Sequence, residues 1–153
     1  MDQKITDKIK DLYTKIHRLS QNSTQQILIV KPASVESKEI IYLSPERARF
    51  YEIVDKLSSE AFFDQLKEAG ENNEWFFVDL KTPSLSAQLY SNLNTLSTLG
   101  YAQKFGTDEE IKQNKKTVVI FIAEEKIMRD EVLPANFASC FAPVVWLGET
   151  IHA

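Results

Sequence analysis

The chain has 153 residues, a net charge of -4 and a single cysteine, Cys140. The acidic balance argues against a surface that binds nucleic acid non-specifically, so nucleic-acid contacts are expected only indirectly. One cysteine excludes an internal disulfide and a multi-cysteine zinc site. With no apolar run near the roughly 20 residues of a membrane span and no signal-peptide segment, we expect a cytoplasmic protein without a membrane span.

The first stretch, residues 3–20, predicts an amphipathic helix. Its apolar residues recur at three- and four-residue steps, with lysines and aspartates on the other face: Ile5, Ile9, Leu12, Tyr13, Ile16 and Leu19. An exposed apolar stripe of this kind would promote association, so it is expected to pack on this domain or on a partner. In the second case the helix could mediate an oligomer. We divide one domain, 1–153, into an N-terminal helix at 1–22 and an α/β core at 26–149.

The core opens with residues 27–30, a continuous aliphatic run that is typical of a strand buried on both faces. A helix is expected over 36–42. A second helix is expected after Ser44, an N-cap residue followed by Pro45 at the first helical position. Periodicity leaves a short strand at 51–54 as the alternative.

A third helix is expected to begin at Ser58 or Ser59 and to end at Gly70. Its inward side chains are Phe62, Phe63 and Leu66.

Residues 75–78 form the second continuous apolar run, and Asp79 follows directly. Thr82 and Pro83 then start a helix whose stripe is Leu85, Leu89, Leu93 and Leu96. In open α/β sheets the ligand crevice lies at the carboxyl ends of the strands, so Asp79 could hold a metal or a phosphate there. The plainer interpretation makes Asp79 a helix-capping or crevice-lining acid without a metal.

The remaining chain adds a polar excursion at 100–116 and two further strands, at 117–123 and 143–147. A short helical turn is expected near 133–137. Strands separated by helical segments predict a three-layer α/β sandwich with a mainly parallel sheet, preceded by the N-terminal helix.

The segment after the first strand has the outline of a phosphate-binding loop, G-x-x-x-x-G-K-[ST], with Pro32 and Ser37 at the glycine positions. Lys38 falls where the phosphate lysine would be, whereas Glu39 replaces the hydroxyl residue that ligates magnesium and Glu36 adds a repelling charge. The alternative is a simple strand-to-helix turn with a solvated lysine.

From 27 to 147 the chain resembles the α/β core of AAA+ ATPases, closest to the modules of clamp-loader delta-prime subunits and of dynein. The Walker B strand corresponds to Val78-Asp79-Leu80, followed by the helix at 87–96, and the sensor 1 strand corresponds to 117–123. The family motif L-P-x-x-x-S-R-C matches 133–140, which reads LPANFASC.

Departures from the family pattern imply that hydrolysis is lost. Leu80 stands at the catalytic glutamate and Ser139 at the trans-acting arginine. The resemblance therefore implies a pseudo-ATPase with no catalytic residues, for which ATP and magnesium are not expected as cofactors. Lys38 and Asp79 would be vestigial cofactor-binding residues, and Asp79 the vestigial metal ligand. The implied role is a non-catalytic scaffolding subunit that binds protein partners in a larger assembly.

Two alternatives stay open. Asp79 and Pro83, in the sequence DLKTP, resemble the phospho-acceptor turn of receiver domains, which have a flavodoxin-like fold; this would be a pseudo-signalling domain. Asp79 and Lys81 also resemble the D/E-x-K motif of magnesium-dependent nucleases, with Asp55 or Asp64 as the second carboxylate. Strand order distinguishes the AAA+ core from the receiver domain. A P-loop core sets the strand at 27–30 between the third and fourth apolar strands, at 117–123 and 143–147. A receiver sets it beside the strand that ends in Asp79.

Overall fold

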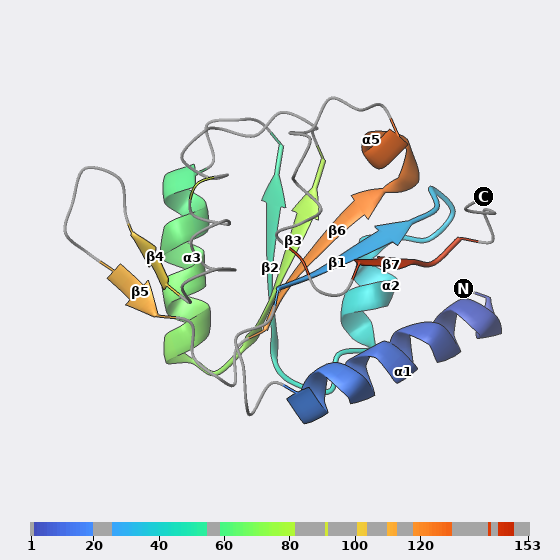
Figure 1. The fold of residues 1–153 in the computed structure, drawn as a ribbon, viewed down its shortest axis with the longest axis horizontal. Coiled ribbons are helices and arrows are strands. Elements are labelled where there is room, and N and C mark those ends of the chain that lie inside the picture. Colours follow the sequence, from blue (N-terminus) through green and yellow to red (C-terminus); the bar gives the residue numbers. More distant parts are fainter. Residues whose placement is uncertain are drawn as a thin grey trace.

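The computed structural model describes residues 2–19, 26–54, 59–81, 91, 101–103, 110–112, 118–129, 141 and 144–148. Its elements, in chain order, are α1 (Gln3–Leu19), β1 (Gln26–Lys31), α2 (Ser37–Tyr42), β2 (Ala48–Ile53), α3 (Ser59–Glu71), β3 (Trp75–Leu80), β4 (Tyr101–Gln103), β5 (Glu110–Lys112), β6 (Val119–Glu124), α5 (Glu125–Arg129) and β7 (Val144–Trp146). They are arranged around one central sheet (Figure 1).

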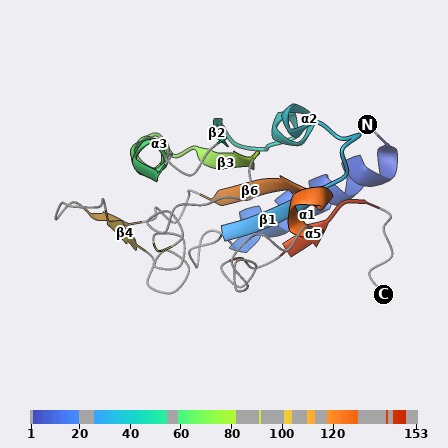
Figure 2. The same ribbon diagram turned by 90° about the horizontal axis from the view of Figure 1, so that it is seen from above.

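The central sheet has five strands in the order β2-β3-β6-β1-β7, and every neighbouring pair is parallel. The predicted α/β fold with a parallel sheet is confirmed. β1 lies between β6 and β7, which is the position expected for a P-loop core. The receiver-like alternative is wrong, because a receiver would set β1 beside β3. Figure 2 shows the strands from above, stepping from β2 through β3 and β6 to β1.

Each face of the sheet carries its own apolar cluster, because side chains alternate along a strand. On one face α1 and α2 pack against Ile29, Phe77 and Ile120. On the other face α3 packs against Phe76 and Phe121. The continuous apolar runs at 27–30, 75–78 and 119–123 are thus explained, since both faces are covered.

The N-terminal helix packs on its own domain. Four side chains of its apolar stripe are buried against the sheet: Ile9, Leu12, Tyr13 and Ile16. Tyr13 also donates a hydrogen bond of 2.7 Å to the carbonyl of Ile40 in α2. Burial raises the pKa of the Tyr13 hydroxyl, so this group remains a donor over the working pH range.

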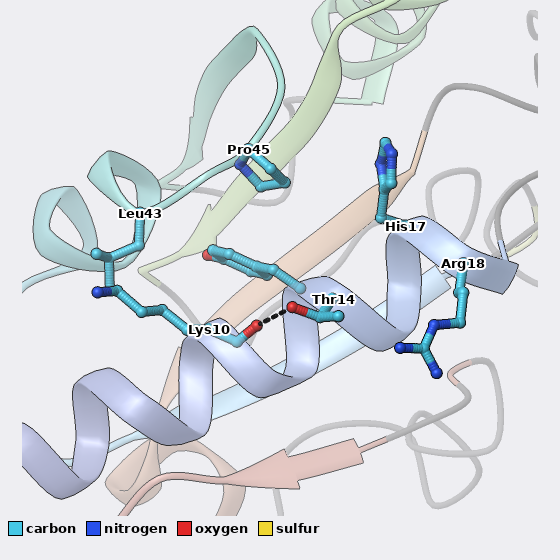
Figure 3. Close-up of a pocket in the computed structure, with 7 residues that line it drawn as sticks. Lys10, Thr14, His17, Arg18, Leu43 and Pro45 are labelled. Carbon is cyan, nitrogen blue, oxygen red and sulfur yellow. Dashed lines mark hydrogen bonds between the residues drawn. The ribbon is translucent and has the colours of Figure 1, made fainter.

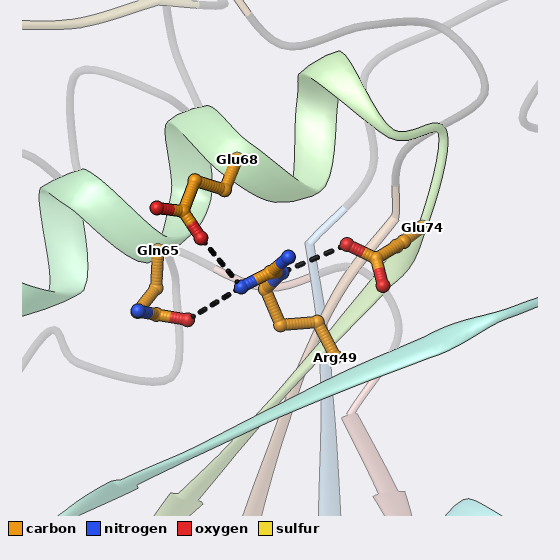
Figure 4. Close-up of polar contacts among 4 residues, drawn as sticks. All are labelled: Arg49, Gln65, Glu68 and Glu74. Atoms are coloured by element: carbon orange, nitrogen blue, oxygen red, sulfur yellow. Dashed lines mark hydrogen bonds and ion pairs between the residues drawn. The ribbon is translucent and has the colours of Figure 1, made fainter.

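The helix predicted after Ser44 is wrong. The region forms a strand, as the alternative at 51–54 proposed, but β2 runs over 48–53 and so begins earlier. It pairs in parallel with β3 from Ala48 opposite Trp75 to Ile53 opposite Leu80. Side chains alternate between the two faces of the sheet, as in a strand. Tyr51 and Ile53 pack on the α3 side, while Phe50 and Glu52 point to the other face. The guanidinium of Arg49 donates hydrogen bonds to Gln65 and Glu68 of α3 and to Glu74, which precedes β3 (Figure 4). These bonds attach β2 to its neighbours.

Helix α3 confirms Phe62, Phe63 and Leu66 as inward residues, but Gly70 does not stop it. The helix continues to Glu71, and Asn73 adopts a left-handed backbone with φ 54°. The amide of Glu74 then donates to the carbonyl of Ala69 at 2.9 Å. Asparagine tolerates this conformation, so it ends the helix in the role that was expected of glycine.

The polar stretch at 100–116 contributes β4 and β5, an antiparallel pair in a separate sheet. Within the described residues, the structure shows no helix long and apolar enough to cross a membrane. Several predictions lie outside the described residues: the leucine stripe of 85–96, the turn at 133–137, Ser139, Cys140 and Asp55.

Candidate functional site

The carboxyl edge of the sheet carries a set of charged side chains that replace apolar ones on the α1/α2 face. Strand alternation sets Asp79 on the same face as Trp75 and Phe77, and Lys31 on the same face as Ile27 and Ile29. Glu52 is in register with Asp79, and Lys31 is in register with Glu124. Together with the loop after β1 they line a crevice of about 330 Å³. This edge is where ligands bind in open α/β folds.

Lys31 is the buried cation of this edge. The residue is only 3% exposed. Its Nζ donates a hydrogen bond of 2.7 Å to the carbonyl of Val35 and lies 3.5 Å from Oε1 of Glu124. A buried ammonium needs such partners because desolvation otherwise disfavours its charge. The loop from Pro32 to Glu36 is thereby closed over the end of β1.

The loop and the start of α2 hold acidic groups rather than an anion cradle. The amide of Val35 donates to the carbonyl of Pro32 at 3.1 Å, which tightens the turn. Glu36 is the N-cap residue of α2, and its amide faces Oε2 of Glu39 at 3.4 Å. Two carboxylates therefore accompany the first turn of the helix, where the backbone dipole favours negative charge.

Lys38, the predicted phosphate lysine, is exposed and pairs with Glu36 at 3.0 Å. The hydrogen bond with Glu36 is the main cause that raises the Lys38 pKa. The side chain lines the crevice, but its ammonium is held at the rim by a residue of its own loop.

Asp79 lies nearly buried at the end of β3 and pairs with Lys81, whose Nζ is 3.1 Å from Oδ2. The hydrogen bond with Asp79 is the first cause that raises the pKa of Lys81. The ammonium of Lys81, two residues along the chain, thus compensates the negative charge of the Asp79 carboxylate. Leu80, between the two, is buried on the opposite face in the cluster with α3.

The structure brings Lys38, Asp79 and Lys81 to one crevice, at the carboxyl edge of the sheet where the strand-end argument sets Asp79. Asp64, a nominal second carboxylate for a nuclease, lies in α3 on the other side of the sheet, so it does not share a metal with Asp79. The site residues predicted from the sequence do not include Lys31, Glu52 and Glu124. A signal is present in the sequence, because Lys31 and Glu124 each end an apolar run, and Glu52 follows Phe50 on the face that carries Asp79.

A second crevice, of about 430 Å³, lies between α1 and the connection from α2 to β2 (Figure 3). Several of its polar side chains are already engaged within the chain. Thr14 donates to the carbonyl of Lys10 at 2.9 Å, and Nδ1 of His17 lies 3.6 Å from Glu46. Lys10 reaches toward Leu43, and Arg18 points to the other side of the helix. Because no set of polar groups converges in this crevice, we place the candidate site at the sheet edge.

Comparison with solved structures finds NtrX from Brucella abortus. In its complex with ADP, NtrX matches 90% of this chain with a TM-score of 0.56 and 11% sequence identity. In its complex with ATP it matches 92% with a TM-score of 0.52 and 9% identity. The chain spans about a third of the NtrX chain, 34% and 35% in the two cases. No family model and no curated protein matches the sequence.

At this level of identity the likeness concerns the fold alone. The strand order of the sheet and the structural similarity to part of NtrX both fit an AAA+-like P-loop fold.

Proposed function

We propose that this chain is a non-catalytic AAA+-like domain that serves as a protein-interaction or scaffolding subunit of a larger assembly. The observation that carries the proposal is the position of Lys31. A phosphate loop after the first strand turns backbone N–H groups toward the phosphate oxygens. Here the carbonyl of Val35 faces inward instead, and it accepts a hydrogen bond from the buried Lys31 ammonium. The loop thus encloses a cation of its own chain.

The charge at the start of α2 supports the same conclusion. In a P-loop the helix N-terminus attracts the phosphates. Glu36 and Glu39 place carboxylates at this position, and Glu36 also engages Lys38. A nucleoside triphosphate would meet two negative charges and would have to separate the Lys38–Glu36 pair. These residues do not fit a triphosphate.

The groups that would act on an attacking water are also unsuited. Hydrolysis needs an aspartate on magnesium and a side chain that orients water. Asp79 is already paired with Lys81. Leu80, at the family's glutamate position, has no polar group and is buried on the far face of the sheet. Loss of a trans-acting arginine alone lowers such rates on the order of 10³–10⁵-fold.

The resemblance to AAA+ ATPases supports the structural half of the proposal. Relatives with inactive sites commonly remain as structural members of multi-subunit assemblies. A domain that keeps the five-stranded parallel sheet while filling its phosphate position fits that role.

Calorimetry and phosphate release with ATP or GTP and magnesium, each at millimolar concentration, test the proposal. NtrX is a suitable positive control, because its structures contain ADP and ATP. We expect neither binding heat nor phosphate release from this chain. Micromolar affinity, or turnover that Asp79→Ala abolishes, would overturn the proposal and favour a magnesium-dependent enzyme that uses Asp79 and Lys81.

A further inference from the structure

The charges that line the crevice at the carboxyl edge of the sheet do not balance. Four carboxylates and three ammonium groups line it. Each ammonium has one carboxylate partner at 3.0 to 3.5 Å, in the pairs Lys31–Glu124, Lys38–Glu36 and Lys81–Asp79. The carboxylate that remains is Glu52, which forms no hydrogen bond or ion pair with any residue that the structure describes. The crevice therefore has an excess negative charge, and it is located at Glu52.

Lys81 lies within the electrostatic reach of Glu52, but it is committed to Asp79. The hydrogen bond with Asp79 is the main cause that raises the pKa of Lys81, and the charge of Glu52 raises it by less. In the described part of the chain, Glu52 thus has no cation of its own.

An exposed aromatic ring lies beside this carboxylate. Phe50 and Glu52 are two residues apart on β2, so their side chains lie on the same face of the sheet, and both line the crevice. Phe50 is 44% exposed. Two residues along a strand span about 7 Å, and a cation that stacks on an aromatic ring lies within about 6 Å of the ring centroid. One flat cation can therefore stack on Phe50 and still reach the carboxylate of Glu52.

The crevice also holds a polar group without a partner. Ser37, the first residue of α2, lines the crevice and is 8% exposed. Among the described residues, its hydroxyl oxygen has no hydrogen-bond partner. Buried hydroxyl groups of folded proteins usually have one. An N–H group of a ligand in the crevice, directly or through a bridging water, can supply it.

We propose that this crevice binds an arginine side chain of a protein partner, whose guanidinium stacks on Phe50 and donates hydrogen bonds to the carboxylate of Glu52. This rests on the proposed function, in which the domain binds other proteins. A guanidinium is flat, stays charged and carries five N–H donors, whereas an ammonium is a compact and more strongly hydrated charge. Arginine therefore fits a ring beside a carboxylate better than lysine does. The volume of about 330 Å³ is at the small end of ligand pockets, which suits a single side chain.

Two other classes of ligand fit the crevice less well. A divalent metal needs several available carboxylates, but three of the four are paired with lysines. The described residues also hold no group of three metal-ligating side chains. An anion would meet the excess negative charge of Glu52, while every lysine of the crevice is already paired.

Titration of the full chain with short peptides, followed by NMR of the backbone amides, tests the proposal. The probe is a blocked pentapeptide with one arginine between glycines, used at low salt because salt screens the ion pair. One matched peptide carries lysine, and another carries citrulline, which keeps the shape of arginine without its charge. We expect the arginine peptide to bind with a Kd on the order of 1 mM and to shift the amides of Phe50 and Glu52. The lysine peptide should bind more weakly and the citrulline peptide not at all. Equal affinity for arginine and citrulline would overturn the proposal.

Variants of the crevice locate the contact. Glu52→Gln keeps the shape of the side chain and should weaken the arginine peptide about tenfold or more, the loss expected for hydrogen bonds to a charged group. Phe50→Leu keeps an apolar side chain and should weaken it about 2- to 5-fold, because the aromatic face is lost. Glu46→Gln is the matched control, since it removes the same charge from an exposed glutamate outside the crevice, and it should bind as wild type. Undiminished binding to Glu52→Gln would place the peptide elsewhere and refute the site.

The result can be separated from the test of the proposed function, because nucleotide binding is measured without the peptide. A chain that is inert to nucleotide and to all three peptides would refute the arginine site and leave the non-catalytic assignment intact. Binding of ATP with magnesium would refute the proposed function itself. Free arginine that binds more tightly than the peptide would identify a small molecule as the occupant and overturn the protein partner.

Discussion

Phe121 lies on β6, in the middle of the sheet, and its truncation to alanine tests whether the core is assigned correctly. The side chain is fully buried in the cluster with α3. Its ring centroid lies 5.2 Å from that of Phe141 and 6.1 Å from that of Phe62. Removing the ring loses its burial, leaves a cavity and ends both aromatic contacts, which together cost about 3–5 kcal/mol.

Domains of this size have a free energy of unfolding of about 5–15 kcal/mol, so the loss is a large fraction of the total. For a chain of about 150 residues it corresponds to a fall of about 6–20 °C in melting temperature. Urea and thermal unfolding, followed by circular dichroism, measure both quantities. Tyr42→Ala is the control, because that exposed side chain should change stability by no more than about 0.5 kcal/mol. If Phe121→Ala stays within about 1 kcal/mol of wild type, Phe121 does not lie in the core as described.

Three further predictions concern polar contacts. Tyr13→Phe should lower the free energy of unfolding by about 0.5–1.5 kcal/mol in urea titrations, because the hydrogen bond to Ile40 is lost, whereas Tyr42→Phe should have no effect; equal values would exclude a contribution from that bond. Arg49→Ala should cost about 1–3 kcal/mol, and Arg49→Lys should recover only part of it because an ammonium lacks the guanidinium fork; full recovery by lysine would contradict the geometry. The raised pKa of Lys81 contributes stability that is complete below the unfolded-state pKa and is lost above it, so wild type should lose stability relative to Lys81→Met as the pH rises beyond about 10; parallel urea midpoints for the two proteins would contradict this.

Central strands of this fold could be predicted from the sequence because they are buried on both faces. The runs at 27–30 and 75–78 are continuous and short, and their length favours a strand over a helix. β2 is an edge strand and is only half covered, so its alternating residues also fit a helical stripe through Phe50 and Ile53. Proline after serine reinforced the helical interpretation. The parallel pairing with β3, which is a long-range interaction, decided otherwise.

The candidate site was predicted in part for a related reason. Asp79 stands out because it ends an uninterrupted apolar run. Lys31 also ends such a run, yet lysine is usually solvated, so its burial depends on the carbonyl of Val35, which the loop brings over it. Loop geometry of this kind is set by the tertiary fold rather than by local pattern. The end of α3 shows the same dependence, since Asn73 rather than Gly70 takes the left-handed position.

The central claim is that the ammonium of Lys31 lies under its own loop, where a P-loop protein holds phosphate. Competitive labelling of lysine amines on the native protein, read by mass spectrometry with and without magnesium and ATP, tests it most directly. Lys31 should be protected and Lys38 should react freely, because their side chains are 4% and 81% exposed, and nucleotide should change neither rate. Labelling of Lys31 as fast as Lys38, or protection of Lys38 by magnesium and ATP, would contradict the account.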